Sequence, residues 1–253
     1  MKIPIYQVDA FSSRVFAGNP AAVCPLTEWL DDDILQAIAA ENNLSETAYF
    51  VPEGSHYRLR WFTPKVEVDL CGHATLASAY VIGKPEVRFM TKSGELTVTR
   101  EGDLFTMDFP ARQPEPQPAN EGLIAAIGGN PDEVLAARDY LVVYKSEDEV
   151  RALKPDMTAL CAIDRFAVIV TAPGSDSDFV SRFFAPSKGI PEDPVTGSAH
   201  CTLTPYWAKR LGKSRLHAFQ LSERGGELWL EDKGERVTIS GKGTLYMEGA
   251  IYI

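Results

Sequence analysis

The stretch that decides the fold is residues 67–76, which reads EVDLCGHATL and follows an aromatic run ending in proline, WFTP at 61–64. The second half of the chain has the same order of features, because FFAP at 183–186 leads to EDPVTGSA at 192–199. In both copies an acidic residue precedes a glycine at the same spacing, and small and apolar residues follow the glycine. A motif that recurs half a chain length away indicates an internal repeat. The sequence therefore predicts two similar lobes, each with a helix that starts near its glycine.

A proline-rich run separates the two copies. Residues 110–118 contain four prolines, and proline fixes φ and removes an amide donor, so this run should be extended and exposed. We expect an N-terminal lobe over 1–115 and a C-terminal lobe over 116–253. A cleft between two such lobes is a usual place for a small-molecule site.

Strand signals outnumber helix signals along the chain. Helices are predicted at 31–41, 74–82 and 199–211, and we expect the last to be kinked, because an interior proline such as Pro205 costs a helix about 3 kcal/mol. Alternating or β-rich runs occur at 6–11, 47–51, 57–62, 95–100, 104–109, 140–144, 166–170, 227–230, 237–240 and 244–253. The predicted class is α+β, with two similar lobes, each a curved, mostly antiparallel, β-barrel-like sheet around a central helix.

Composition limits the kinds of partner. The 253 residues carry a formal charge of −10, so neither nucleic acid nor an anionic membrane would meet a basic face. The N-terminus enters a strand directly and lacks the apolar stretch of a signal peptide. Four scattered cysteines do not suggest a disulfide framework, and we expect a cytoplasmic protein with reduced thiols.

The two glycine motifs could bind an anion. Each leaves free amides at a helix N-terminus, which suit a carboxylate or phosphate. We expect Gly72 and His73 to meet Gly197 and Ser198 around one cleft; the alternative is that the glycines are ordinary turn residues. At the positive end of its helix, His73 should stay neutral and act as a donor, unless it is a core histidine satisfied by backbone.

Two side chains of the first lobe compete as the proton acceptor. Cys71 precedes a helix, where the pKa of a thiol can fall, although most free cysteines are small packing residues. The matching residue of the second copy is Thr196, which is no base at neutral pH, and this argues against an epimerase that uses two thiols. Glu46 follows the 31–41 helix and stands at the entrance to an apolar strand, where a desolvated carboxylate can take and return a proton.

Asp193 is a further candidate, because Pro194 forces it towards an extended backbone and its carboxylate could then bind a substrate amine or hydroxyl. It could equally be a turn residue. Cys71, His73, His200 and Cys201 lack the spacing of structural zinc ligands, so we expect no metal site. Phosphate-binding loops, dinucleotide fingerprints and nucleophile elbows are not found in the sequence, so nucleotide use and serine hydrolysis lose their main support.

Taken together, these motifs resemble the PhzF-like phenazine-biosynthesis family, whose fold is related to that of diaminopimelate epimerase. The residues that carry the resemblance are VDAF at 8–11, FAGNPA at 16–21, NLSET at 43–47, LCGHAT at 70–75 and EDPVTGSAH at 192–200. They occur in the family's order from the first predicted strand into the last third of the chain.

The resemblance implies a cofactor-independent acid/base isomerase of a small carboxylate, usually a homodimer, in which Glu46 shuttles the proton. Residues that match Gly72, His73, Asp193, Gly197 and Ser198 line the substrate pocket in that family. Two alternatives remain: an amino-acid epimerase or racemase that uses Cys71, and a binding protein that kept the fold without activity. Family membership does not identify the substrate.

Overall fold

The computed structural model describes residues 1–118 and 120–253, which form two compact units. The first contains Met1–Asp108 and Ile239–Ile253, and the second contains Phe109–Thr238. This division differs from the expected lobes at 1–115 and 116–253, because the last fifteen residues return to the first unit. They do so by pairing with the N-terminal strand, Lys2 with Tyr252 and Ala10 with Gly243. Residue 119, inside the expected linker, lies outside the described residues.

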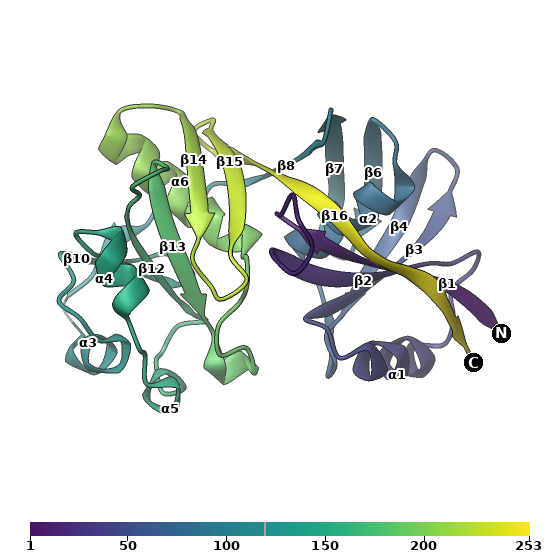
Figure 1. Ribbon diagram of the computed structural model, residues 1–253, viewed down its shortest axis with the longest axis horizontal. Coiled ribbons are helices and arrows are strands. Elements are labelled where there is room, and N and C mark those ends of the chain that lie inside the picture. Colours follow the sequence, from purple (N-terminus) through teal and green to yellow (C-terminus); the bar gives the residue numbers. More distant parts are fainter. Residues whose placement is uncertain (119) are drawn as a thin grey trace. The chain divides into compact units, whose positions relative to one another are not determined.

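The first unit is a closed ring of strands with one helix enclosed and another outside (Figure 1). Its hydrogen-bonded order is β1-β2-β3-β4-β6-β7-β8-β16, and the pairing of β16 with β1 closes the ring. Helix α1 spans Asp32–Asn42 and helix α2 spans Gly72–Ile82. The strands are β1 (Lys2–Ala10), β2 (Asn19–Pro25), β3 (Glu46–Glu53), β4 (His56–Phe62), β5 (Glu67–Val68), β6 (Glu86–Thr91), β7 (Gly94–Glu101), β8 (Leu104–Pro110) and β16 (Arg236–Tyr252).

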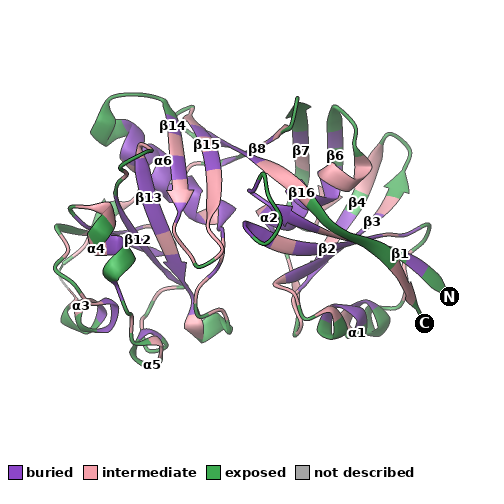
Figure 2. Ribbon diagram, in the orientation of Figure 1, coloured by how far each residue is buried: buried purple, intermediate pink, exposed green. Residues whose placement is uncertain are grey.

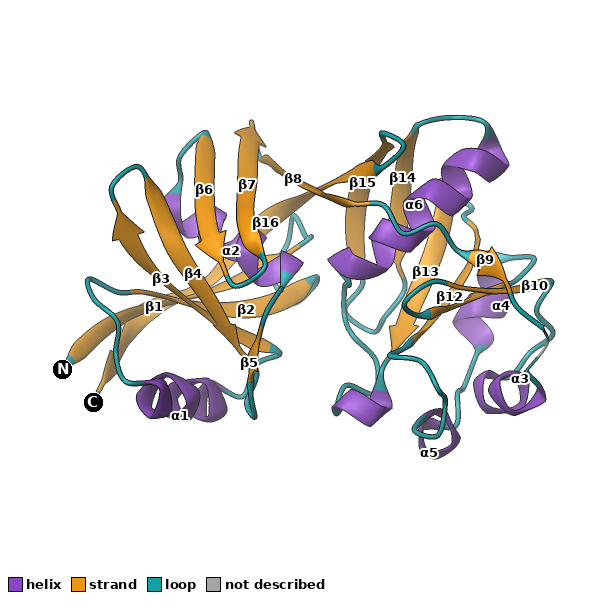
Figure 3. Ribbon diagram, turned by 180° about the vertical axis from the view of Figure 1, so that it is seen from behind, coloured by secondary structure: helices purple, strands orange, loops and turns teal. Residues whose placement is uncertain are grey.

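The second unit continues the sheet from the start of β16 in the order β15-β14-β13-β12-β11-β10-β9. Its helices are α3 (Glu121–Ile127), α4 (Glu147–Ala152), α5 (Met157–Leu160), the 3₁₀ turn η1 (Pro186–Lys188) and α6 (Gly197–Leu211). Its strands are β9 (Glu115–Pro116), β10 (Glu133–Ala136), β11 (Tyr140–Val143), β12 (Val168–Pro173), β13 (Phe179–Phe184), β14 (Arg215–Gln220) and β15 (Gly226–Asp232). Figure 3 shows α6 lying along the strands of this sheet.

The two units repeat one topological plan. In the first, β2 pairs parallel with β3 and β4 pairs parallel with β6, with an antiparallel hairpin between them. In the second, β11 pairs parallel with β12 and β13 pairs parallel with β14, again around an antiparallel hairpin. Parallel neighbours need a crossover, and helices supply it: α1 and α2 in one unit, α4 with α5 and then α6 in the other. The α+β class of two similar curved sheets, each with its helix, is confirmed.

Burial explains why α2 lies inside its ring. Its residues are apolar or small nearly all round, and Leu76, Ala77 and Ala79 are at most 1 % exposed. Helix α1 instead packs one side, including Leu35 and Ile38, against strand residues such as Tyr49. Figure 2 shows the matching pattern, with α2 largely buried and the outer side of α1 exposed. The predicted starts at Gly72 and Gly197 are confirmed, and α6 continues through Pro205.

Some elements differ from the sequence prediction. The two runs at 237–240 and 244–253 form one long strand, β16. The sequence patterns did not predict β2, β6, β10, β13 and β14, or the short helices α3, α4 and α5. No helix in the described part of the chain is long and apolar enough to cross a membrane.

The turn between β1 and β2 requires a glycine. Gly18 has φ +68, and a Cβ there would lie 2.2 Å from the carbonyl oxygen of Ala10. The same turn is held by the Asp9 carboxylate, which accepts a hydrogen bond from the Phe16 amide at 2.9 Å. Backbone atoms of Ala10 lie where the side chain of any other residue at position 18 would begin, so a substitution there has to move β1.

We therefore predict that Gly18→Ala lowers the free energy of unfolding by about 3 kcal/mol or more, since a backbone clash adds to the cost of positive φ. Gly54→Ala is the matched control, because Gly54 has φ +60 and no atom lies within 4 Å of the place that a Cβ would occupy. The control should lose about 1 kcal/mol. Urea unfolding of both variants measures the difference, and equal losses would contradict the steric argument.

Candidate functional site

Glu46 is placed by the end of α1 and the start of β3. Asn43 ends the helix in the left-handed region at φ 50, and the chain then enters β3 at Glu46, which lies opposite Ala21 of β2 in the parallel ladder. The residue is 9 % exposed. A carboxylate is thus held at the edge of the apolar interior of the first unit, as predicted for the acid/base residue.

Cys71 and His73 are placed by the N-terminus of α2. Cys71 has extended backbone, φ −145 and ψ 106, and the helix begins at Gly72. His73 lies in the first turn and is 6 % exposed. The amides of the first turn have no carbonyl partner within the helix. Gly72 and His73 stand at this helix start, so their amides have no carbonyl partner within the helix.

The structure brings Glu46, Cys71 and His73 together. Glu46 Oε2 lies 3.2 Å from His73 Nε2, and Cys71 Sγ lies 3.5 Å from His73 Nδ1. The distance between Glu46 Oε2 and His73 Nε2 is that of an ion pair, but the two atoms do not have the geometry of a hydrogen bond. Neither atom has another hydrogen-bond partner among the described residues. Buried polar atoms are nearly always satisfied, so an unsatisfied carboxylate oxygen beside an unsatisfied imidazole nitrogen makes this pair the candidate functional site.

The pKa of His73 is shifted in the direction opposite to the one that the helix dipole favours. Burial opposes protonation, but Cys71 and Glu46 beside the ring outweigh it and raise the pKa of His73 well above its usual range. The predicted neutral imidazole rested on the helix dipole, which two acidic neighbours overcome. For Cys71, burial and then the nearby Glu46 raise the pKa of the thiol, so the lowered pKa suggested by its place before a helix is also not found.

The same three side chains have the donor types of a metal site. In the described part of the chain, one donor atom each from Glu46, Cys71 and His73 lie within 4.8 Å of one another. The histidine of the second glycine motif is differently placed: His200 Nδ1 lies 2.8 Å from the Thr196 carbonyl oxygen, and burial lowers the pKa of His200 to about 4.

In the second unit, Asp193 and Thr196 form the turn before α6. The Asp193 carboxylate accepts a hydrogen bond from the Thr196 hydroxyl, and the Thr196 amide donates to Gln220 Oε1 at 2.8 Å. Gln220 Nε2 also donates to the Asp193 carbonyl at 2.8 Å, so β14 fixes the turn. The Asp193 carboxylate therefore makes at least one hydrogen bond within the turn, as expected if it is a turn residue.

Ser198 is the first polar side chain of α6, and it accepts a hydrogen bond from Arg138 Nη2 at 3.2 Å. Together with Gly197 it forms the start of the helix, as predicted. Arg138 and Gln220 were not predicted. They lie far from the motif in sequence, and the one local signal was the adjacent arginine–aspartate pair before a β-rich run. That the two helix starts serve one substrate stays a prediction.

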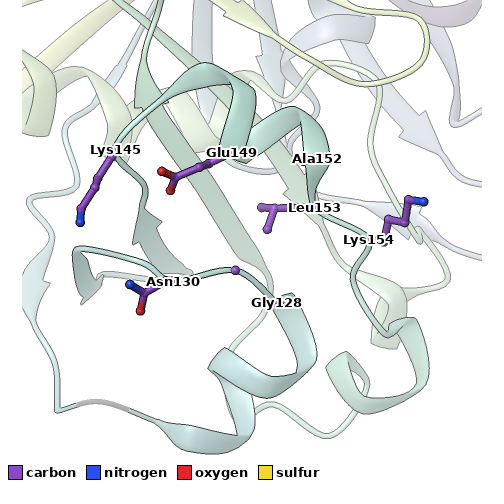
Figure 4. Close-up of a pocket in the computed structure, with 8 residues that line it drawn as sticks. Gly128, Asn130, Lys145, Glu149, Ala152, Leu153 and Lys154 are labelled. Atoms are coloured by element: carbon purple, nitrogen blue, oxygen red, sulfur yellow. The ribbon is translucent and has the colours of Figure 1, made fainter.

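A cavity of about 430 Å³ lies elsewhere in the second unit (Figure 4). It is lined by Gly128, Gly129, Asn130, Lys145, Glu149, Ala152, Leu153 and Lys154, and contains none of the predicted site residues. The Glu46–His73 contact remains the stronger candidate for chemistry because it combines buried ionisable groups with unsatisfied polar atoms.

Comparison with known proteins gives a consistent result. The family model described as phenazine biosynthesis-like protein, PhzC-PhzF, matches residues 8–249. An uncharacterised isomerase of Pseudomonas aeruginosa is 56 % identical, with 100 % of both chains covered. A human phenazine biosynthesis-like domain-containing protein is 41 % identical, with 99 % of both chains covered.

Solved structures agree. A PhzF-family protein of Enterococcus faecalis is 48 % identical, covers 100 % of both chains and superposes with a TM-score of 0.98. A hydroxyproline epimerase of Agrobacterium vitis shares the fold with a TM-score of 0.62 at 11 % identity, covering 99 % of this chain and 92 % of that one. The diaminopimelate epimerase-like fold and the resemblance seen in the motifs are thus confirmed, and the chain belongs to the PhzC-PhzF family of phenazine biosynthesis-like proteins.

Proposed function

We propose that the protein is a cofactor-independent isomerase that moves a proton on a small carboxylate substrate, with Glu46 as the base that takes and returns it. The observation that carries this proposal is the contact between Glu46 Oε2 and His73 Nε2, two buried atoms 3.2 Å apart without a directed hydrogen bond. Relatives that share more than half of the sequence are named isomerases, which supports the reaction class.

The reaction requires a carbon acid beside an existing negative charge. Glu46 removes the proton, the C–H electron pair forms a double bond to the neighbouring carbon of an adjoining C=C group, and the displaced π pair at the far carbon takes the proton back from the protonated Glu46. Amides at the start of α2, including that of Gly72, and the protonated His73 offset the developing charge. One base that takes and returns the proton suits a shift along one face of the substrate better than inversion.

In the second unit we propose that Gly197 and Ser198 bind the substrate. We propose two roles for Asp193: it holds the turn through Thr196, and it contributes to the substrate site. Hydrogen bonds from β14 keep this turn in place, which supports a binding role that needs fixed geometry. The homodimer and the cytoplasmic location expected from the sequence stay predictions.

The epimerase alternative requires Cys71 to act as a base. Burial and the neighbouring Glu46 carboxylate raise the pKa of its thiol, which disfavours the thiolate that would have to accept the proton. The N-cap residue in the equivalent place of α6 is Thr196, which supplies no second thiol. These two observations favour Glu46. A binding protein without activity would show no hydrogen exchange on any substrate.

The first test is Glu46→Gln, which keeps the shape and removes the base. A panel of small unsaturated or α-hydrogen carboxylates is screened for deuterium incorporation, and the variant should lose about 10²–10⁴ in rate on the active compound. Glu53→Gln, at the exposed end of the same strand, is the matched control and should retain the rate. Cys71→Ala should lose far less. An inactive Cys71 variant beside an active Glu46 variant would make the epimerase the better assignment.

The second prediction concerns the protonation of His73. Its folded pKa is raised above the unfolded value, so protonation stabilises the fold fully below the unfolded pKa and ceases to do so as pH rises through the folded one. Ring ¹⁵N NMR at pH 7 should show an imidazolium at His73 and a neutral ring at His200, whose pKa is about 4. Glu46→Gln should lower the pKa of His73 and leave His200 unchanged. A neutral His73 at pH 6 would refute the proposed charge state.

The third prediction concerns metal. Since Glu46, Cys71 and His73 could hold an ion, treatment with a strong chelator followed by metal analysis is informative. A cofactor-independent enzyme should keep its full exchange rate after chelation. Loss of activity that zinc or cobalt restores would instead assign the three side chains as ligands.

A further inference from the structure

Arg138 lies in the loop between β10 and β11. Its side chain contacts several residues, and one of its nitrogen donors is left unused. Its Nε and Nη2 donate to the carboxylate of Asp139 at 3.0 Å each, and Asp139 is fully buried. Nη2 also donates to Ser198 Oγ at 3.2 Å. Nη1 has no hydrogen bond to a described residue, and the side chain is 34 % exposed. The guanidinium is thus oriented by a buried carboxylate while one nitrogen stays available.

A second cation lies near Arg138, whose own charge is paired with the Asp139 carboxylate. Its guanidinium carbon lies 4.5 Å from the centroid of the Phe166 ring, and Lys188 Nζ lies 5.4 Å from the same centroid. Phe166 is 41 % exposed, so the ring and the two cations beside it are open to solvent. Two positive groups on one exposed ring repel each other, and an anion bound beside them would remove that repulsion.

These contacts exceed what a structural role needs. The fork of Arg138 satisfies the buried Asp139 with Nε and Nη2, so neither Nη1, Lys188 nor the exposed ring is required for that purpose. A guanidinium with a free edge, held rigid and stacked on an aromatic ring, is the usual arrangement for binding a carboxylate or a phosphate. The contact with Ser198 connects it to the helix start at which the substrate is proposed to bind.

We propose that Arg138, with Lys188, binds a second anionic group of the substrate, so that the substrate is a small dicarboxylate rather than a monocarboxylate. Arg138 is then a specificity-determining residue, and Ser198 and Arg138 bind adjoining parts of one ligand. The identification of this ligand as the substrate rests on the proposed isomerase function. The anion site itself does not, because it is built from Arg138, Phe166, Lys188 and Ser198 alone.

The test measures binding directly, without turnover. Succinate and glutarate are titrated into the full chain at constant ionic strength, with butyrate as the probe that lacks a second charge, and amide NMR shifts at Ser198 and Phe166 report occupancy. At least one dicarboxylate should bind about 10-fold or more tightly than butyrate, since a charge-assisted hydrogen bond contributes about 1.5–3 kcal/mol. Arg138→Lys keeps the charge but loses the fork, and should remove most of that preference.

Arg138→Gln leaves the buried Asp139 carboxylate unpaired and could prevent folding, so the double variant Arg138→Gln with Asp139→Asn removes both charges together. It should bind dicarboxylates and butyrate equally weakly. Arg215→Gln is the control for loss of one positive charge, because its side chain is 87 % exposed and pairs with Glu231, and it should retain the preference.

Equal binding of dicarboxylates and butyrate by the wild type, or an unchanged preference in Arg138→Lys, would overturn the anion site whatever the activity proves to be. If the preference holds and Glu46→Gln still catalyses exchange, the anion site stands and the assignment of Glu46 fails. If excess phosphate abolishes the preference for dicarboxylates while butyrate still binds, the result would support a general anion site.

Discussion

The contact between the Glu46 carboxylate and the His73 imidazole is the interaction on which the rest of the site depends. Both side chains are buried. Burying an ion without a partner costs free energy, so each side chain lowers the cost of ionising the other. They come from different elements, the first residue of β3 and the first turn of α2. Their distance is therefore fixed by how the helix lies within the ring of strands.

The ring closes only when the two ends of the chain meet. β16 pairs with β1 along nearly the whole length of β1, so residues 243–252 complete a unit that begins at Lys2. Closure pairs one edge of β1 with β16, while β2 pairs with the other edge over residues 6–10, and the ring confines α2, whose small residues are buried. The buried side chains of Glu46 and His73 are largely shielded from water, which strengthens their electrostatic interaction. The fold thus supplies the low-dielectric surroundings that the proposed chemistry needs.

The starts of α2 and α6 are alike, but they lie beside side chains of opposite charge. Cys71 and Thr196 are the N-cap residues of α2 and α6, and the second residue of each helix meets a charged side chain. His73 meets the carboxylate of Glu46, whereas Ser198 meets the guanidinium of Arg138. The repeated framework thus carries a buried carboxylate–imidazole contact in one copy and an arginine–serine contact in the other.

The sequence predicted local features well and non-local ones poorly. Glycine and its flanking residues specify where α2 and α6 begin, because that signal lies within a few positions. Glu46 was singled out mainly by resemblance, since nothing local brings it next to His73. The return of β16, the contacts of Arg138 and the charge state of His73 depend on residues brought together by the fold. A dipole argument from one helix could not anticipate the carboxylate from β3.

The most direct test is a double-mutant cycle on the free energy of unfolding, using Glu46→Gln, His73→Asn and the double variant. If the two groups form a buried charged pair, the coupling energy near neutral pH should lie in the range of about 0.5–3 kcal/mol, and it should decline as pH rises through the raised pKa of His73. Effects that add at every pH, within about 0.3–0.5 kcal/mol, would show that Glu46 and His73 do not interact as ions and would contradict the account.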